Sequence, residues 1–187
     1  MESALDLFSK RANCNPRQEE VRVEQLNNGD QIAVERHCSD LSRVLCPTMG
    51  HTGGKYFHHG IFDGKRSEVI EFYGETNDKS NARVITRLIG EFAPEGHKLY
   101  RVVHKKCLPV EKTMEMAKRA LKAKKLPAYN LLFFNCETFA TWLKTGCPCS
   151  KQVSDAIEWN LSLFFLVVAV FIVFAIVIFR LLRRNKP

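Results

Sequence analysis

Cys136 is the residue of this chain with the clearest capacity for covalent chemistry. It stands near the start of a predicted helix, NCETFATWLK, for which Asn135 is a good N-cap residue and Gly146 is a natural end. The N–H groups and the dipole at a helix start stabilise a thiolate and lower a cysteine pKa from about 8.5 toward about 3.5 to 7.5. Such a sulfur is a nucleophile, although a cysteine flanked by phenylalanines is more often a buried structural residue.

A predicted hairpin can supply the two further groups that a thiol enzyme needs, an imidazole near the sulfur and a polar group that orients the ring. Its strands are residues 56–62 and 68–73. The segment between them begins with Asp63-Gly64, a strong signal for a tight turn.

Three side chains of this hairpin are candidate partners of the thiol. His58 and His59 are neighbours on the first strand and point to opposite faces, so at most one of them can face the helix that carries Cys136. The return strand brings Glu71 alongside. An isolated pair of histidines is more often a surface or core feature, and this alternative stays open at the level of spacing alone.

The other predicted elements are grouped by type, which predicts an α+β fold. Residues 31–36 alternate as a strand, and a second pair of strands is predicted at residues 83–89 and 98–103. Residues 110–126 have helical periodicity and a lysine-rich face, which is either solvated surface or a contact for lipid headgroups. Residues 1–25 are predicted to be a loose N-terminal arm.

An apolar run close to the C-terminus predicts a membrane-spanning helix. Residues 161–179 include Ser162 as their one polar side chain and would extend about 28 Å as a helix, close to the roughly 30 Å core of a bilayer. A core helix usually keeps a polar face and is rarely followed by a basic tail such as residues 180–187. We therefore expect a single-pass tail anchor.

Two arguments about the orientation of this anchor disagree. The basic tail favours a cytosolic C-terminus by the positive-inside rule. A span this close to the end of the chain emerges only after synthesis is complete, which places residues 1–160 in the cytosol, and this second argument is the one we adopt. The endoplasmic reticulum, the peroxisome and the mitochondrial outer membrane remain equal candidates for the organelle.

Charge and cysteine content restrict the other partners. The net charge is +8, and the tail supplies half of it, so the body is only mildly basic and we expect no nucleic-acid partner. Seven cysteines cannot all pair, and the absence of an apolar leader indicates a reducing compartment. Cys147-Pro148-Cys149 has one intervening residue where zinc sites usually have two to four, so we expect a loop, with no metal ion and no cofactor.

Two segments make the chain resemble a known family. HHGIF at residues 58–62 and NCETF at residues 135–139, in this order, are similar to the motifs of the lecithin retinol acyltransferase family, and the Gly-Asp pair at residues 29–30 also fits. The layout is closest to the HRAS-like suppressor phospholipase/acyltransferases of that family. The resemblance implies a circularly permuted papain-like (NlpC-type) fold, in which an antiparallel sheet packs against helices, followed by a C-terminal membrane helix.

The domain organisation that follows has five parts: an arm (1–25), a catalytic domain (26–147), a linker (148–160), a transmembrane helix (161–179) and a basic tail (180–187).

The resemblance assigns roles to three residues. Cys136 is the expected nucleophile and His58 the expected general base and acid. Glu71 is the weakest assignment, because the family generally has a second histidine on the return strand, one residue earlier; Thr138 likewise stands where a histidine is usual. A carboxylate can still accept a hydrogen bond from the ring of His58 and stabilise the imidazolium.

The implied reaction starts from a glycerophospholipid. The thiolate attacks an ester carbonyl and forms an acyl thioester, and water, an amine or an alcohol then takes the acyl group. The backbone N–H of Cys136 is the expected oxyanion donor. The alternatives are a catalytically silent, tail-anchored interaction or membrane-remodelling protein, retinol esterification, and peptide or amide hydrolysis.

Overall fold

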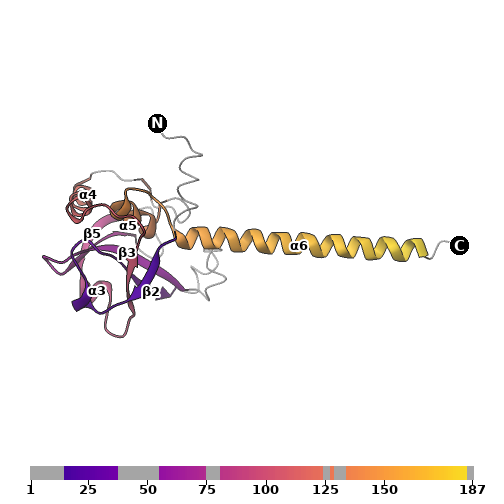
Figure 1. The fold of residues 1–187 in the computed structure, drawn as a ribbon, viewed down its shortest axis with the longest axis horizontal. Helices are drawn as coiled ribbons and strands as arrows, with labels where there is room; N and C mark the ends of the chain where they lie inside the picture. Colours follow the sequence, from indigo (N-terminus) through magenta and orange to yellow (C-terminus); the bar gives the residue numbers. More distant parts are fainter. Residues whose placement is uncertain (1–14, 38–54, 75–80, 124–126, 129–133, 185–187) are drawn as a thin grey trace.

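The computed structural model describes residues 15–37, 55–74, 81–123, 127–128 and 134–184, which form an α+β domain and one long projecting helix (Figure 1). The strands are β1 (Arg17–Glu20), β2 (Gln31–His37), β3 (Lys55–Asp63), β4 (Glu68–Tyr73), β5 (Arg83–Leu88) and β6 (Leu99–Val103). The helices are the 3-10 turn η1 (Val23–Gln25), α3 (Ile89–Phe92), α4 (Val110–Lys122), α5 (Cys136–Thr145) and α6 (Lys151–Arg184).

The six strands form one antiparallel sheet in the order β1-β6-β2-β3-β4-β5. The α+β prediction is confirmed, and so is the hairpin of β3 and β4, in which Gly60 lies opposite Glu71. The prediction of a second strand pair is wrong in its pairing. β5 adds to the outer edge of β4, whereas β6 lies between β1 and β2 at the other side of the sheet.

The N-terminal segment differs from the predicted loose arm where the structure describes it. β1 pairs along its full length with β6, and Val21 beyond it is buried. Glu19 on β1 pairs with Arg101 on β6 (3.3 Å), and Glu20 pairs with Lys98, the residue before β6 (3.0 Å). The charged residues of this segment therefore contribute to an edge strand, while residues 1–14 lie outside the described part of the chain.

The sheet separates two apolar clusters, as expected when alternate residues of each strand point to opposite faces. One cluster packs α4 and α5 against β3 and β4 through Ile61, Ile70, Phe72, Met114, Phe139 and Leu143. The other lies on the opposite face and contains Ile32, Val34, Phe62, Val69, Phe92 and Leu99. Because Ile61 is on the face that α5 covers, His59 shares that face and His58 belongs to the other.

The ends of α5 are formed as the sequence predicts. The side chain of Asn135 accepts a hydrogen bond of 2.8 Å from the N–H of Thr138, which caps the first turn. Gly146 ends the helix in the left-handed region at φ +80°, and its N–H bonds to the carbonyl of Trp142. Cys136 is thereby fixed as the first residue of the helix.

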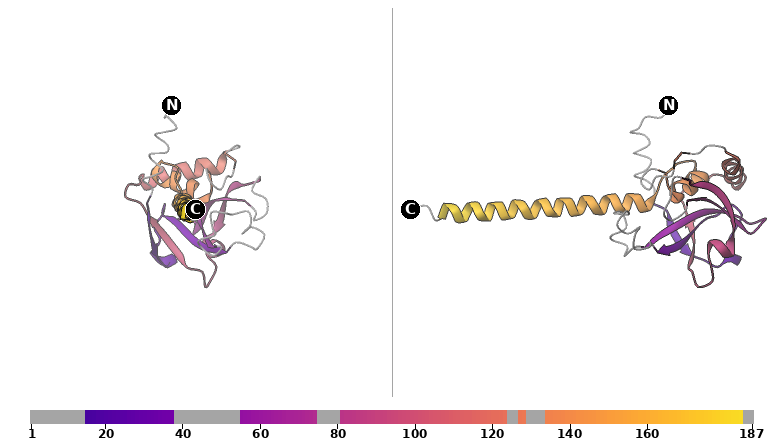
Figure 2. Two further views of the ribbon diagram at one scale, coloured as in Figure 1. Left: turned by 90° about the vertical axis from the view of Figure 1, so that its right-hand side faces the viewer. Right: turned by 180° about the vertical axis from the view of Figure 1, so that it is seen from behind.

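α6 is a single helix of 34 residues that projects away from the domain as a rod (Figures 1 and 2). Residues 151–160, predicted to be a linker, are helical and continuous with the apolar run. In the described part of the chain this is the one helix that is long and apolar enough to cross a membrane, over Lys151–Phe174. Many of its large apolar side chains are exposed, from Leu161 to Ile176.

A substitution at Gly60 tests the close contact between β3 and β4. A Cβ atom at this position would collide with the side chain of Val69 and lie 3.1 Å from the carbonyl oxygen of Ile70. We expect Gly60→Ala to lower the free energy of unfolding by about 1–3 kcal/mol, measured by urea unfolding of the full chain in detergent micelles. Gly90→Ala is the control, because no atom lies within 4 Å of its added methyl group, and it should change stability by less than about 1 kcal/mol.

Candidate active site

The register of the β3–β4 hairpin places His58 and Glu71 on the same face of the sheet. Glu71 lies opposite Gly60, and His58 is two residues before Gly60 on the same strand. Nε2 of His58 and Oε2 of Glu71 form a short hydrogen bond. The ring of His58 packs near those of Phe92, with centroids 5.5 Å apart, and Tyr73, at 6.4 Å.

Arg87 on β5 holds the other oxygen of the same carboxylate. Its Nε donates to Oε1 of Glu71 at 2.5 Å, and its guanidinium carbon lies 4.7 Å from the centre of the Tyr73 ring. Only 1% of the Glu71 side chain is exposed, so the buried carboxylate has a cationic or potentially cationic donor at each oxygen. Arg87 was not among the predicted site residues, because β5 was expected to pair with residues 98–103 and not with β4.

These partners keep Glu71 ionised. Burial opposes ionisation, but hydrogen bonds and charges from His58 and then Arg87 outweigh it and lower the pKa of Glu71 below its ordinary value. The carboxylate is therefore a fixed negative charge beside His58.

Cys136, the third predicted site residue, lies at the start of α5. Its side chain is buried, and Sγ lies 4.0 Å from the carbonyl oxygen of Phe57. Burial raises the pKa of Cys136, but the charge of His58, its hydrogen bond to the sulfur and the backbone N–H of His59 more than reverse this effect, so the pKa falls below its ordinary value.

The proton released by the thiol is retained by the imidazole. Burial lowers the pKa of His58, whereas Cys136 and then Glu71 raise it, with a final value of about 9. The lowered pKa of the thiol and the raised pKa of the imidazole both favour a thiolate–imidazolium pair. The structure brings Cys136, His58 and Glu71 together, as the sequence predicts. α5 covers the sheet face that carries His59, and Cys136 lies close to His58 because it is the first residue of this helix.

His59 lies on the opposite side of β3 in a network of amide side chains. Its Nδ1 is 3.4 Å from Nε2 of Gln31, and its Nε2 is 3.4 Å from Nε2 of Gln152. Burial lowers the pKa of His59 to about 4, with smaller contributions from Glu137, which raises it, and from His58 and His104, which lower it. His59 is accordingly neutral and has a different environment from His58.

Gln31 connects this network to Thr141 on α5 and to His104. Its Nε2 donates to Oγ1 of Thr141 at 3.1 Å, and Nε2 of His104 lies 2.7 Å from its Oε1. Burial and then the charge of Lys144 lower the pKa of His104 to about 4, so His104 is neutral and its Nε2–H is the donor to Gln31. Gln31, His104 and Thr141 were not predicted as neighbours, because they are too far apart in the chain for local patterns to connect them.

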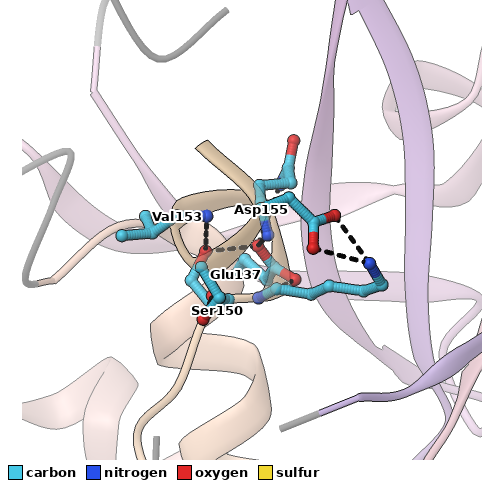
Figure 3. Close-up of polar contacts among 7 residues, drawn as sticks. Glu137, Ser150, Val153 and Asp155 are labelled. Carbon is cyan, nitrogen blue, oxygen red and sulfur yellow. Dashed lines mark hydrogen bonds and ion pairs between the residues drawn. The ribbon is translucent and has the colours of Figure 1, made fainter. Parts of the chain in front are cut away.

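Glu137, the residue after Cys136, accepts hydrogen bonds from the start of α6 (Figure 3). The N–H of Lys151 donates to Oε1 at 2.9 Å, the N–H of Gln152 donates to Oε2 at 3.2 Å, and the hydroxyl of Ser150 donates to Oε2 in a short bond. The Ser150 oxygen in turn accepts from the N–H of Val153 at 3.2 Å. The first three N–H groups of α6 are thus all bonded to these two side chains.

The Cys147-Pro148-Cys149 segment is a loop, as predicted, but its cysteines differ. Cys147 is free and half-buried, whereas Cys149 is buried and disulfide-bonded. The cysteines of this segment are therefore not equivalent: the thiol of Cys147 is reduced and that of Cys149 is oxidised. Within the described residues, no group of three or more His, Cys, Asp or Glu side chains could hold a metal ion.

Comparison with known proteins adds one match. The family model described as Lecithin retinol acyltransferase matches residues 24–149, which is more than half of the chain and includes the three predicted site residues. Among curated proteins no match was found.

The ionised thiol predicts a characteristic dependence of alkylation on pH. The rate at Cys136, followed by site-resolved mass spectrometry with iodoacetamide, should rise less steeply with pH between about pH 6 and about pH 8 than that of free cysteine, which gains about tenfold per pH unit in the same reaction. In His58→Ala the rate at Cys136 should rise with pH as it does for free cysteine. A wild-type rate that also follows free cysteine would contradict the ion pair.

The bond from Arg87 to Glu71 makes a second prediction. Arg87→Met leaves the buried carboxylate with one donor, so the charge that supports the imidazolium is weakened. We expect thiol-dependent turnover to fall about tenfold, a part of the roughly 10²- to 10⁴-fold that a positioned acid–base group contributes. Arg83→Met, at the exposed start of the same strand, is the matched control and should keep wild-type turnover. Equal turnover of the two variants would contradict a role for Arg87 in the active site.

Proposed function

The chain belongs to the lecithin retinol acyltransferase family, and from this premise we propose that it is a membrane-anchored thiol acyltransferase or phospholipase acting on glycerophospholipids. Acyltransferase activity in general follows from the family. The observation that carries the thiol mechanism is the buried group of Cys136, His58 and Glu71, in which the pKa of the thiol is lowered and that of the imidazole is raised.

In the first half of the proposed reaction, Sγ of Cys136 forms a bond to an ester carbonyl carbon of the phospholipid. The carbonyl oxygen becomes negative and is met by the backbone N–H of Cys136, where the N-terminus of α5 adds its dipole. Collapse of this intermediate breaks the bond to the glycerol oxygen. His58 gives its proton to that oxygen, and a lysophospholipid leaves while the acyl group remains as a thioester.

In the second half His58 is neutral and acts as the base. It takes a proton from the acceptor, which is water, an amine or an alcohol, as the acceptor oxygen or nitrogen attacks the thioester carbonyl. The thiolate leaves and regenerates the starting ion pair. Glu71 holds the ring of His58 by its Nε2 and stabilises the imidazolium that forms, while Arg87 prevents the carboxylate from turning away.

The position of α6 supports a membrane lipid as acyl donor. The helix begins beside the site, and Gln152 on its first turn and Sγ of Cys136 both approach the carbonyl oxygen of Phe57. A helix of this length and composition that crosses a bilayer would hold the thiolate close to the membrane surface. We propose a tail anchor with the domain in the cytosol, and a layout like that of the HRAS-like suppressor phospholipase/acyltransferases; the organelle and the acceptor are left open.

The decisive test is the intact mass of the full chain in phosphatidylcholine vesicles. We expect an added acyl mass together with released lysophosphatidylcholine, and loss of both in Cys136→Ala. His58→Ala should slow acylation by about 10²- to 10⁴-fold, and Glu71→Gln should slow it less. The corresponding control is Cys107→Ala, which removes an exposed thiol outside the site and should leave acylation unchanged.

Folded, vesicle-bound protein that shows neither adduct nor lysophospholipid would instead favour a catalytically silent membrane module. Cleavage of peptides without lipid turnover would favour an amidase.

A further inference from the structure

The first turn of α6 lies against the strand that carries His58. The side-chain amide of Gln152 forms two hydrogen bonds with one backbone residue, Phe57: the Phe57 N–H donates to Oε1 at 2.7 Å, and Nε2 donates to the Phe57 carbonyl at 3.1 Å. A side chain that bonds to both groups of a strand residue holds it much as a neighbouring strand would. Phe57 directly precedes His58, so this support acts next to the imidazole.

β3 needs such support at this position because of how the sheet is paired. β2 pairs with β3 along one edge, as far as Lys55. On the other edge, β4 pairs with β3 from Gly60 onward, which leaves Phe57 beyond that ladder. The Phe57 carbonyl oxygen is also the group that lies 4.0 Å from Sγ of Cys136. One backbone carbonyl therefore contacts both the nucleophile and α6.

Gln152 is itself fixed by Glu137. Its Nε2 donates to Oε2 of Glu137 at 3.0 Å, and its backbone N–H donates to the same oxygen at 3.2 Å. Glu137 is 3% exposed and follows Cys136 on the first turn of α5. The amide thus lies between the residue before His58 and the residue after Cys136, and it joins the two elements that must present the imidazole and the thiol to each other.

We infer that Gln152 is a positioning residue of the thiol site: it fixes Phe57, and through Phe57 it fixes His58 and the backbone N–H of His59 against Cys136. The inference rests on the proposed thiol chemistry and adds α6 to the active site. Because α6 continues as one helix from this turn into its apolar segment, the orientation of that segment also sets the geometry of the thiol and imidazole.

The test compares Gln152→Met with Lys151→Met in the full chain in detergent micelles. Methionine keeps the length of the glutamine side chain but forms neither bond to Phe57. Lys151 is the matched control, because its side chain pairs with Asp155 while its backbone N–H carries the bond to Glu137. For each protein we would measure the pH profile of Cys136 alkylation, kcat and KM with phosphatidylcholine, and hydrogen exchange at the Phe57 amide.

We expect Gln152→Met to shift the alkylation profile upward by about one pH unit, which slows alkylation by up to about tenfold at pH values below the pKa of the thiol. The value of kcat should fall by a similar factor with KM little changed, and the Phe57 amide should exchange faster. Lys151→Met should match the wild type in all three measurements. A purely structural role of Gln152 would lower stability without moving the pH profile.

A folded Gln152→Met protein with the wild-type profile, kcat and exchange rate would overturn the inference and leave the proposed function intact. If Gln152→Met does not fold, exchange in the wild type decides: a protected Phe57 amide supports the inference, and exchange at the rate of a free amide overturns it. Failure of the proposed function would be recognised separately. Cys136 of the wild-type protein would then form no acyl adduct, at any rate of hydrogen exchange of the Phe57 amide.

Discussion

The carboxylate of Glu71, held between His58 and Arg87, is the interaction on which the charges of the site depend. Removal of a carboxylate from water costs several kcal/mol, and this cost is offset only where its oxygens meet well-placed donors. Arg87 is protonated at any ordinary pH, so the negative charge persists when His58 gives up its proton. Without this fixed charge the buried imidazole would tend to the neutral form, and the thiol would lose one reason to ionise.

Local sequence patterns were sufficient for the elements that carry the catalytic candidates. The Asp63-Gly64 turn and the alternation on either side of it predict β3 and β4 with their register, and this register sets Glu71 beside His58. Asn135 and Gly146 likewise predict both ends of α5. The neighbours of β1, β5 and β6 could not be predicted in this way, because alternation identifies a strand but contains no information about which distant edge it joins.

The same distinction explains which site residues were missed. Arg87 reaches the carboxylate only because β5 pairs with β4, and Gln152 reaches Phe57 only because α6 starts beside β3. The segment around Gln152 was predicted to be a linker, because it lies between the predicted catalytic domain and the apolar run. One local signal was present: Ser150 is a good N-cap residue, and its oxygen accepts from the N–H of Val153.

The two buried glutamates of the site, Glu71 and Glu137, have opposite effects on the ion pair of thiol and imidazole. Glu71 supports a positive imidazole, whereas Glu137 stands next to the thiolate and by itself raises the pKa of Cys136. The bonds from Ser150, Lys151 and Gln152 hold the Glu137 carboxylate at the N-terminus of α6, where the helix dipole favours a negative charge. Glu137 can therefore lie next to Cys136, because the N-terminus of α6 stabilises its carboxylate. The hydrogen bonds that join the domain to α6 therefore begin at Ser150, inside the site, and ten residues separate Ser150 from the start of the apolar run at Leu161.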